Sequence, residues 1–190
     1  WFRGPSYGQV RADQRTSGTA ATLGANVVAL LGSEDAAIEY FKELDENIFQ
    51  YTRSGSAPGR MAATGDVAVS IIFSHDCVKL QEEGFAELLV GTFPEEGTGY
   101  EIGGMALIAN APEPDAAKQW IEWALTPEAQ AIAQTVNSLQ LPTNPDTPVS
   151  ELSVNLSEVN LVDYNFPAAG ENRTEIVERF DMEIAPQPTE

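Results

Sequence analysis

The sequence predicts an α/β fold built around a largely parallel sheet. Short apolar runs rich in β-branched residues alternate along the chain with longer segments whose apolar residues recur at helical spacing. This alternation is typical of parallel strands connected by crossover helices. Several helical segments also follow Ser or Thr, and the first ends at Gly, which are ordinary start and stop signals.

The predicted elements of the first half alternate between strands and helices, and turn-forming residues separate them. A strand opens the chain, and two amphipathic helices follow it. A third helix begins with proline in its first turn, and a short apolar run predicts a buried strand after it. The predicted ranges are 6–13 for the opening strand, 20–31, 34–44 and 56–65 for the helices, and 67–73 for the buried strand.

The remainder of the chain, from residue 78 onward, is predicted to hold further strands and four helices. The spacing of Ala116, Trp120 and Trp123 predicts a helix with one buried face, and Thr126 is the expected N-cap of the next helix. The predicted ranges are 78–83, 115–125, 127–136 and 172–184 for helices, and 85–90 and 101–108 for strands.

The composition excludes several classes of partner and cofactor. The 29 acidic and 10 basic side chains give a formal charge of −19, which argues against nucleic acid and anionic lipid. A single cysteine, Cys77, and a single histidine exclude an internal disulfide, a cysteine-based zinc site and a multi-histidine metal site. No cofactor is expected. No apolar run approaches the roughly 18 residues that span a bilayer.

The acidity is concentrated in the later part of the chain. Residues 1–79 carry a net charge of −2, whereas residues 80–190 carry −17. The near-neutral first part can therefore hold a small anion, even though the whole chain is strongly acidic. An acidic surface that only aids solubility is the plainer interpretation of residues 80–190.

Two hydroxyl-rich segments stand before predicted helices. They are Ser17-Gly18-Thr19, after Arg15, and Ser54-Gly55-Ser56, between Arg53 and Arg60, and these nearby arginines would favour an anion. Free backbone N–H groups and the positive end of the helix dipole suit phosphate, sulfate or carboxylate. Because parallel sheets bind ligands beyond the carboxyl ends of their strands, both segments are expected to face one crevice. Two unrelated capped helices would have the same pattern.

Polar side chains that follow the predicted strands could complete such a site. His75 and Asp76 come directly after the buried strand, and Glu101 follows the predicted domain boundary at 94–100. They form donors and acceptors suited to sugar hydroxyls or to an ammonium group. A hydrolase using His75 with Asp76 or Cys77 is an alternative, but no G-x-S-x-G elbow surrounds Ser74. An exposed loop carboxylate is the alternative for Glu101.

Several short segments of the chain, taken in their order along the sequence, resemble those of the periplasmic solute-binding proteins of ABC importers with the type II two-lobe fold. The subgroup is the one that contains ferric-iron, hexose-phosphate and aminoethylphosphonate binders, and the resemblance covers nearly the whole chain. It rests on 16–20 (Thr-Ser-Gly-Thr-Ala), 54–58 (Ser-Gly-Ser-Ala-Pro), 65–69, 74–76 (Ser-His-Asp), 93–104, 116–125, 141–145 and 171–173.

The resemblance implies a particular domain organisation. Residues 1–93 would form the second lobe, 94–101 a hinge crossover and 102–190 the C-terminal part of the first lobe. Family chains are longer, so a signal segment and half of the first lobe are expected to precede this fragment. The protein would be an extracytoplasmic monomer that closes on its ligand without catalysis and delivers it to an ABC permease in the membrane.

The resemblance also implies roles for the site residues. In the hexose-phosphate and phosphonate binders, the positions of Ser17–Thr19 and Ser54–Ser56 would hold the anionic head. His75, Asp76 and Glu101 would hold hydroxyls or an amine at the other end. Carboxylates oppose a bare, multiply charged anion, so the expected ligand is a small organic solute with a phosphate or phosphonate group.

Metal capture is the main alternative within the same family. Ferric members bind iron through tandem tyrosines just after the strand that here ends at Phe73, where this chain has His75, Asp76 and Cys77. Ferric ion prefers hard anionic oxygen ligands, which this set supplies poorly, so no metal ligands are assigned. A ligand-sensing module with the transporter fold is a third possibility.

Overall fold

The computed structural model describes residues 9–163 and 165–185 and contains two compact units. The first comprises the residues up to Tyr100 together with those from Leu156 onward. The second is Glu101–Asn155. The division at Tyr100 falls inside the predicted crossover 94–101, and the C-terminal residues return to the first unit. The assignment of these units to the lobes of a two-lobed protein stays a prediction.

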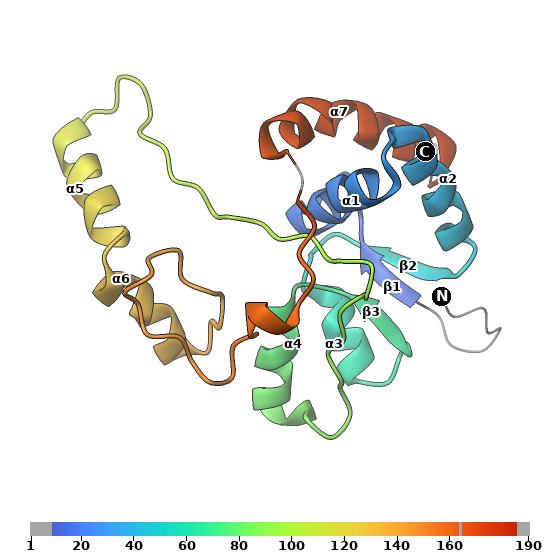
Figure 1. Cartoon of the computed structure of the whole chain (residues 1–190), viewed down its shortest axis with the longest axis horizontal. Coiled ribbons are helices and arrows are strands. Elements are labelled where there is room, and N and C mark those ends of the chain that lie inside the picture. Colours follow the sequence, from blue (N-terminus) through green and yellow to red (C-terminus); the bar gives the residue numbers. More distant parts are fainter. Residues whose placement is uncertain (1–8, 164, 186–190) are drawn as a thin grey trace. The chain divides into compact units, whose positions relative to one another are not determined.

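A three-stranded sheet forms the centre of the first unit (Figure 1), and its strands are parallel, as the sequence predicted. Its strands are β1 (Gln9–Ala12), β2 (Ile48–Thr52) and β3 (Val69–Ile71), in the order β2-β1-β3. In the register, Val10 pairs with Gln50 on one side and with Ser70 on the other. The opening strand is confirmed for residues 9–12, and residues 6–8 lie outside the described part.

The connections place helices on both faces of this sheet (Figure 1). Helices α1 (Gly18–Leu31) and α2 (Glu34–Asp45) lead from β1 to β2, and α3 (Ala57–Ala63) leads from β2 to β3. Both α1 and α3 contact β1, from opposite faces. The chain therefore runs from the central strand to one neighbour and then crosses to the other. Parallel α/β sheets bind ligands at such a switch point.

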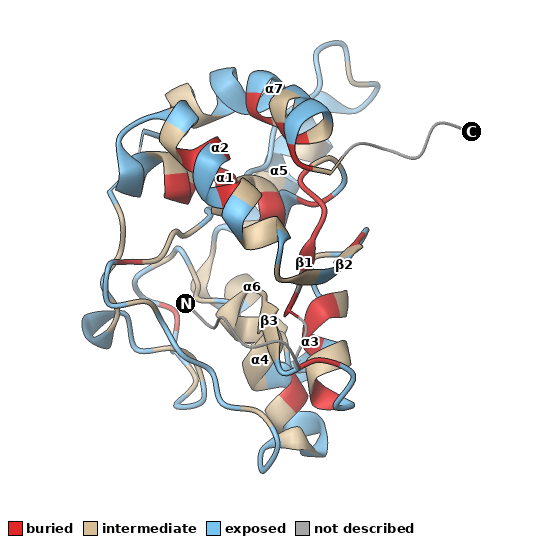
Figure 2. Ribbon diagram, turned by 90° about the vertical axis from the view of Figure 1, so that its right-hand side faces the viewer, coloured by how far each residue is buried: buried red, intermediate tan, exposed pale blue. Residues whose placement is uncertain are grey.

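The core of the first unit lies between the sheet and three helices. The long α7 (Phe166–Glu183) packs against α1 and α2, and buried residues gather on their inner faces and on β1 (Figure 2). The buried apolar side chains of this cluster are Val27, Ala37, Ile38, Phe41, Phe180 and Ile184. Close packing of these helices against one face of the sheet holds the strands in place, so the loops that follow the strands have fixed starting points.

Local signals located the two helices of the first crossover correctly. Gly32 ends α1 with φ of 79°, the left-handed conformation that favours glycine. The Ser33 side chain accepts a hydrogen bond of 3.2 Å from the Ala36 N–H and caps α2. Helix α7 begins earlier than the predicted residue 172, because Asn165 caps it through the Ala168 N–H at 3.1 Å.

The two predicted strands at 85–90 and 101–108 are wrong. Residues 81–85 form a π-helical turn that continues α4 (Ser74–Leu80), and a turn follows them. Residues 101–108 have no regular secondary structure and are exposed. In the described residues neither run finds a neighbouring strand to pair with, and a strand without a partner leaves its backbone groups unsatisfied. The strand β2 at Ile48–Thr52 was not among the predicted elements.

The second unit contains helices α5 (Pro114–Ala124) and α6 (Pro127–Ala131) and a 3₁₀ turn at 132–136. The predicted N-cap is confirmed, since Thr126 Oγ1 accepts from the Ala129 N–H at 3.2 Å. The predicted burial of α5 is wrong: the exposed fractions of Trp120 and Trp123 are 62% and 44%. The two indoles contact each other instead, with ring centroids 4.8 Å apart, because no second layer covers this face in the described residues.

A short parallel bridge joins the two chain segments that run between the units. Thr98 pairs with Leu161, the Thr98 N–H donates to the Asn160 carbonyl at 2.9 Å, and the Val162 N–H donates to the Thr98 carbonyl at 2.9 Å. Both segments belong to the first unit at this point. The chain therefore leaves and returns to the first unit through one hydrogen-bonded pair of segments.

Candidate ligand-binding site

The sheet brings three of the predicted polar segments to one edge. Residues 13–19 follow β1, residues 53–56 follow β2 and residues 72–76 follow β3. All three strands are parallel and adjacent, so their carboxyl ends lie side by side. This edge is where an open parallel sheet binds its ligands.

The first segment presents the amino end of α1. Ser17 is the N-cap residue and is buried, but its side chain makes no capping hydrogen bond, and Thr19 is half-buried. The N–H groups of Gly18, Thr19 and Ala20 fall in the first turn, where an α-helix has no acceptor of its own. These groups and two hydroxyls form a cluster of donors at the positive end of a helix of 14 residues.

The second segment has the same chemistry at the end of β2. The Thr52 hydroxyl donates to the Ser54 carbonyl at 2.8 Å and tightens the loop. The hydroxyl oxygens of Ser54 and Ser56 lie 3.2 Å apart. Ser56 is the N-cap residue of α3 without a capping side-chain hydrogen bond, so both serine hydroxyls lie beside the helix end rather than closing it.

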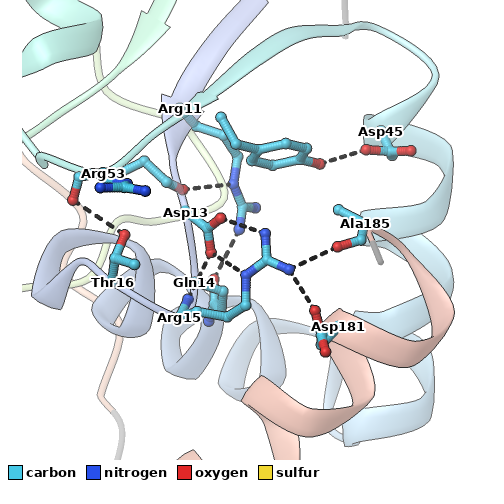
Figure 3. Close-up of polar contacts among 11 residues, drawn as sticks. Arg11, Asp13, Gln14, Arg15, Thr16, Asp45, Arg53, Asp181 and Ala185 are labelled. Atoms are coloured by element: carbon cyan, nitrogen blue, oxygen red, sulfur yellow. Dashed lines mark hydrogen bonds and ion pairs between the residues drawn. The ribbon is translucent and has the colours of Figure 1, made fainter. Parts of the chain in front are cut away.

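The two hydroxyl-rich segments meet at Gly55. A Cβ atom on Gly55 would lie 3.0 Å from Ser17 Oγ, 3.0 Å from Thr19 Cβ and closer still to Thr19 Oγ1. In addition, the Thr16 hydroxyl donates to the Arg53 carbonyl at 3.1 Å (Figure 3). The structure therefore joins Ser17, Thr19 and residues 53–55 in one surface, which two unrelated helix caps would not do.

His75 and Asp76 lie in the first turn of α4, directly after β3. The helix begins at Ser74, whereas the sequence predicted it from residue 78. The His75 ring stacks on Phe73, with centroids 5.5 Å apart and planes 20° apart. His75 Nε2 and Asp76 Oδ1 are 3.9 Å apart, and both side chains are about one-fifth exposed. The pair is thus held in place but still reaches solvent.

Glu101 and Cys77 are placed differently from the other candidates. Glu101 is exposed and is the first residue of the second unit, so its role in a site on the first unit stays a prediction. Cys77 is a half-buried free thiol on α4, and burial raises its pKa. A raised pKa lowers the thiolate fraction, which is the opposite of what a nucleophile needs.

The arginines near the two motifs do not all serve the site. The Arg15 guanidinium bridges Asp13, the Ala185 carbonyl and Asp181 (Figure 3). Arg60 pairs with Glu83 at 2.6 Å. The expectation that these two positive charges favour the anion is therefore wrong for this structure, because carboxylates already neutralise them. Arg53 is exposed beside Ser54.

Asp13 is a functional candidate that the motif analysis missed. Its Oδ1 accepts from the Arg15 N–H and from Arg15 Nε, both at 2.8 Å. Its carbonyl accepts from the N–H groups of Thr16 at 3.2 Å and Ser17 at 3.1 Å. Asp13 thus shapes the turn into α1. An aspartate between a predicted strand and a helix start is a typical Asx-turn residue, and this sequence signal could have identified Asp13.

The chemistry of this edge is that of a cluster of uncharged hydrogen-bond donors. Hydroxyls and helix-end N–H groups gather from two loops, and an imidazole–carboxylate pair stands at the third strand. Among the described residues, no three His, Cys, Asp or Glu side chains are grouped so that they could hold a metal ion. Over the same residues, no helix has the length and apolar character needed to cross a membrane.

Several solved structures share this fold. AfuA, a periplasmic binding protein of Actinobacillus pleuropneumoniae solved with fructose 6-phosphate bound, matches with a TM-score of 0.88 and 39% identity, over 93% of this chain and 56% of AfuA. The periplasmic binding protein P5PA matches with 0.85 and 30%, over 93% and 56%. The ferric binding protein of Campylobacter jejuni matches with 0.77 at 21% identity, over 94% and 59%, a likeness of fold alone.

A sequence relative and a family profile agree with the structural matches. An uncharacterised protein of Haemophilus influenzae is 36% identical over 177 residues, which is 91% of this chain and 50% of the relative. The chain thus spans about half the length of the relatives it matches. A family profile also matches this chain, and the proteins of that family bind solutes rather than catalyse reactions. Because the profile of the bacterial extracellular solute-binding protein family matches residues 2–155, well over half of the sequence, the chain belongs to that family.

Proposed function

We propose that this chain forms part of the solute-capturing component of an ABC importer and that its ligand is a small organic phosphate or phosphonate, such as a hexose phosphate. The observation that carries the proposal is the meeting of the two hydroxyl-rich loops at Gly55. Their hydroxyls and the amino end of α1 bind the anionic group. The fructose 6-phosphate bound to AfuA, at 39% identity, supports the same ligand class.

The proposed site residues divide into two groups. Ser17, Gly18, Thr19, Ser54, Gly55 and Ser56 hold the anionic group. His75 and Asp76 hold hydroxyls or an amine of the organic part, and Glu101 is a further candidate for that role. The importer's permease in the membrane is the proposed protein partner.

Calorimetric titration of the whole protein tests this assignment. Fructose 6-phosphate should bind, whereas fructose and inorganic phosphate should each bind at least tenfold more weakly, because each fills only one half of the site. Ser17→Ala should weaken fructose 6-phosphate binding by about tenfold or more, since a hydrogen bond to a charged group contributes roughly 1.5–3 kcal/mol. Ser150→Ala, in a turn of the second unit, is the matched control and should leave affinity unchanged.

The same titration separates the proposal from iron capture. Ferric citrate should give no heat and no thermal shift, whereas a phosphate ester at 100 times its dissociation constant should add about 2.7 kcal/mol of stability. A purified protein loaded with iron, together with no response to hexose phosphates or aminoethylphosphonate, would overturn the phosphate assignment. Metal analysis after mild purification provides that reading.

A further inference from the structure

We propose that Asp13 and Asp181, acting through Arg15, are positioning residues that fix the orientation of the proposed anion-binding loop between β1 and α1, so that α7 influences the affinity of a site formed by other elements. The inference deepens the proposed function and rests on it. It concerns residues beyond the ligand contacts, and Figure 3 shows the network that carries it.

The loop between β1 and α1 is held at its two ends. At its start, the Asp13 N–H donates to the Thr52 carbonyl at 2.8 Å, which ties the loop to the end of β2. At its end, the Thr16 and Ser17 N–H groups donate to the Asp13 carbonyl. The position of Ser17, and with it the amino end of α1, therefore depends directly on where Asp13 lies.

Arg15 connects this turn to the C-terminal end of α7. Its Nε and Nη2 hold the two carboxylate oxygens of Asp13, while Nη1 donates to the Ala185 carbonyl at 2.8 Å and pairs with Asp181. The Arg15 and Asp13 side chains are only 18% and 11% exposed. A bidentate pair of this kind fixes orientation as well as distance.

The Asp13 carboxyl of this network keeps its negative charge. Burial by itself raises the pKa of the Asp13 carboxyl, but the hydrogen bonds from Arg15 and its charge hold that pKa below the ordinary value. The Asp13 carboxylate is therefore ionised around neutral pH and is paired with the Arg15 guanidinium within the protein. Arg15 orients the loop and leaves the ligand to the hydroxyls and N–H groups.

An unrelated ion pair on the same helix provides the matched control. Glu183 on α7 pairs with Lys42 of α2 at 2.9 Å, and its side chain is 33% exposed against 43% for Asp181. Among the described residues, Glu183 forms ion pairs with Lys42 and with Arg179, and neither pair involves the turn at 13–17. Asp181→Asn and Glu183→Gln thus each remove one carboxylate from α7, and only the first is connected to the loop.

The test measures two quantities on the whole protein: hydrogen exchange at the Arg15, Thr16 and Ser17 amides without ligand, and fructose 6-phosphate affinity by calorimetry. Asp181→Asn should speed exchange at these amides and weaken affinity three- to tenfold, and Asp181→Glu should restore most of both. Glu183→Gln should change both by less than twofold. Arg15→Lys, which keeps the charge but not the two-sided contact, should weaken affinity further.

Two results would contradict a positioning role for Asp181. Equal losses of affinity for Asp181→Asn and Glu183→Gln would mean that α7 only stabilises the fold in general, and would overturn the positioning role. Unchanged exchange at the three amides in Asp181→Asn would overturn it as well. If the unmodified protein binds no phosphate ester, the proposed function fails, yet the exchange comparison still decides whether Asp181 orders the loop.

Discussion

Gly55 lies directly against Thr19, although the two residues belong to different loops that follow different strands. A methyl group on Gly55 would overlap the Thr19 hydroxyl and crowd its Cβ at 3.0 Å. The absence of a side chain at Gly55 is therefore what allows the two hydroxyl-rich segments to form one surface. Cβ atoms essentially never lie so close to other heavy atoms, so a substitution must displace one of the loops.

Gly55→Ala should selectively damage ligand binding. We expect the affinity for a phosphate ester to fall at least tenfold, because Thr19 must rotate or the loops must separate, and misplaced donors lose their hydrogen bonds. Gly103→Ala is the control, since a Cβ there meets nothing within 4 Å. Calorimetry on both variants measures the difference. Equal affinities for the two would show that the loops do not act together.

Phe180→Ala should destabilise the first unit strongly. Phe180 is 1% exposed, and its ring packs edge-on to Tyr51 with centroids 5.4 Å apart. Removing a buried phenylalanine costs about 3–5 kcal/mol, a large part of the stability of an ordinary domain. Urea unfolding should record this loss. Met182→Ala, at a 70% exposed position of the same helix, should change the unfolding free energy by less than about 0.5 kcal/mol.

Local sequence signals were sufficient for much of the fold. Ser33, Gly32 and Thr126 mark helix ends through contacts within four residues along the chain, so their roles could be predicted without knowledge of the rest. The parallel sheet followed from the alternation of strands and helices. Because the carboxyl ends of parallel strands share one edge, the meeting of the Ser17 and Ser54 segments could be predicted as well.

Long-range pairing explains what the sequence did not reveal. Arg15 is one of ten basic side chains, and its partner Asp181 lies 166 positions away, so no local pattern connects them. Residues 85–90 have the composition of a strand, but a strand also requires a neighbour. The amphipathic pattern of α5 predicts a buried face without saying what covers it, and Trp120 is exposed in this structure.

Arg11 is a buried arginine whose guanidinium has only part of its hydrogen-bonding capacity satisfied. Its side chain is buried against aromatic rings, with the guanidinium carbon 4.7 Å from the Phe41 centroid and 5.2 Å from that of Phe180. Burial lowers its pKa. Nη2 donates to Gln14 Oε1 at 2.8 Å, while Nη1 finds no acceptor among the described residues. The buried charge is therefore only partly compensated.

Arg11→Met should destabilise the protein by about 1–3 kcal/mol, chiefly because the buried Gln14 amide loses its partner. The double variant with Gln14→Leu should recover at least half of that loss, since replacing both partners of a buried polar pair by apolar groups is often nearly neutral. Urea unfolding of the four proteins in the cycle measures the coupling. Additive losses would mean that the Arg11–Gln14 hydrogen bond contributes nothing.

Asp13 should make stability depend on pH in the acidic range. Because its pKa in the folded protein lies below the ordinary value of 3.8, its ionised form favours folding. This contribution is fully present above the unfolded pKa and is lost as the pH falls through the lower, folded pKa. Asp13→Asn should therefore be less stable than the unmodified protein at pH 7, and the gap should narrow as the pH falls below about 4. Thermal unfolding between pH 3 and pH 7 measures this gap, with the exposed Glu151→Gln as the control. A gap that stays constant down to pH 3 would contradict the assignment of the Arg15 ion pair to an ionised Asp13.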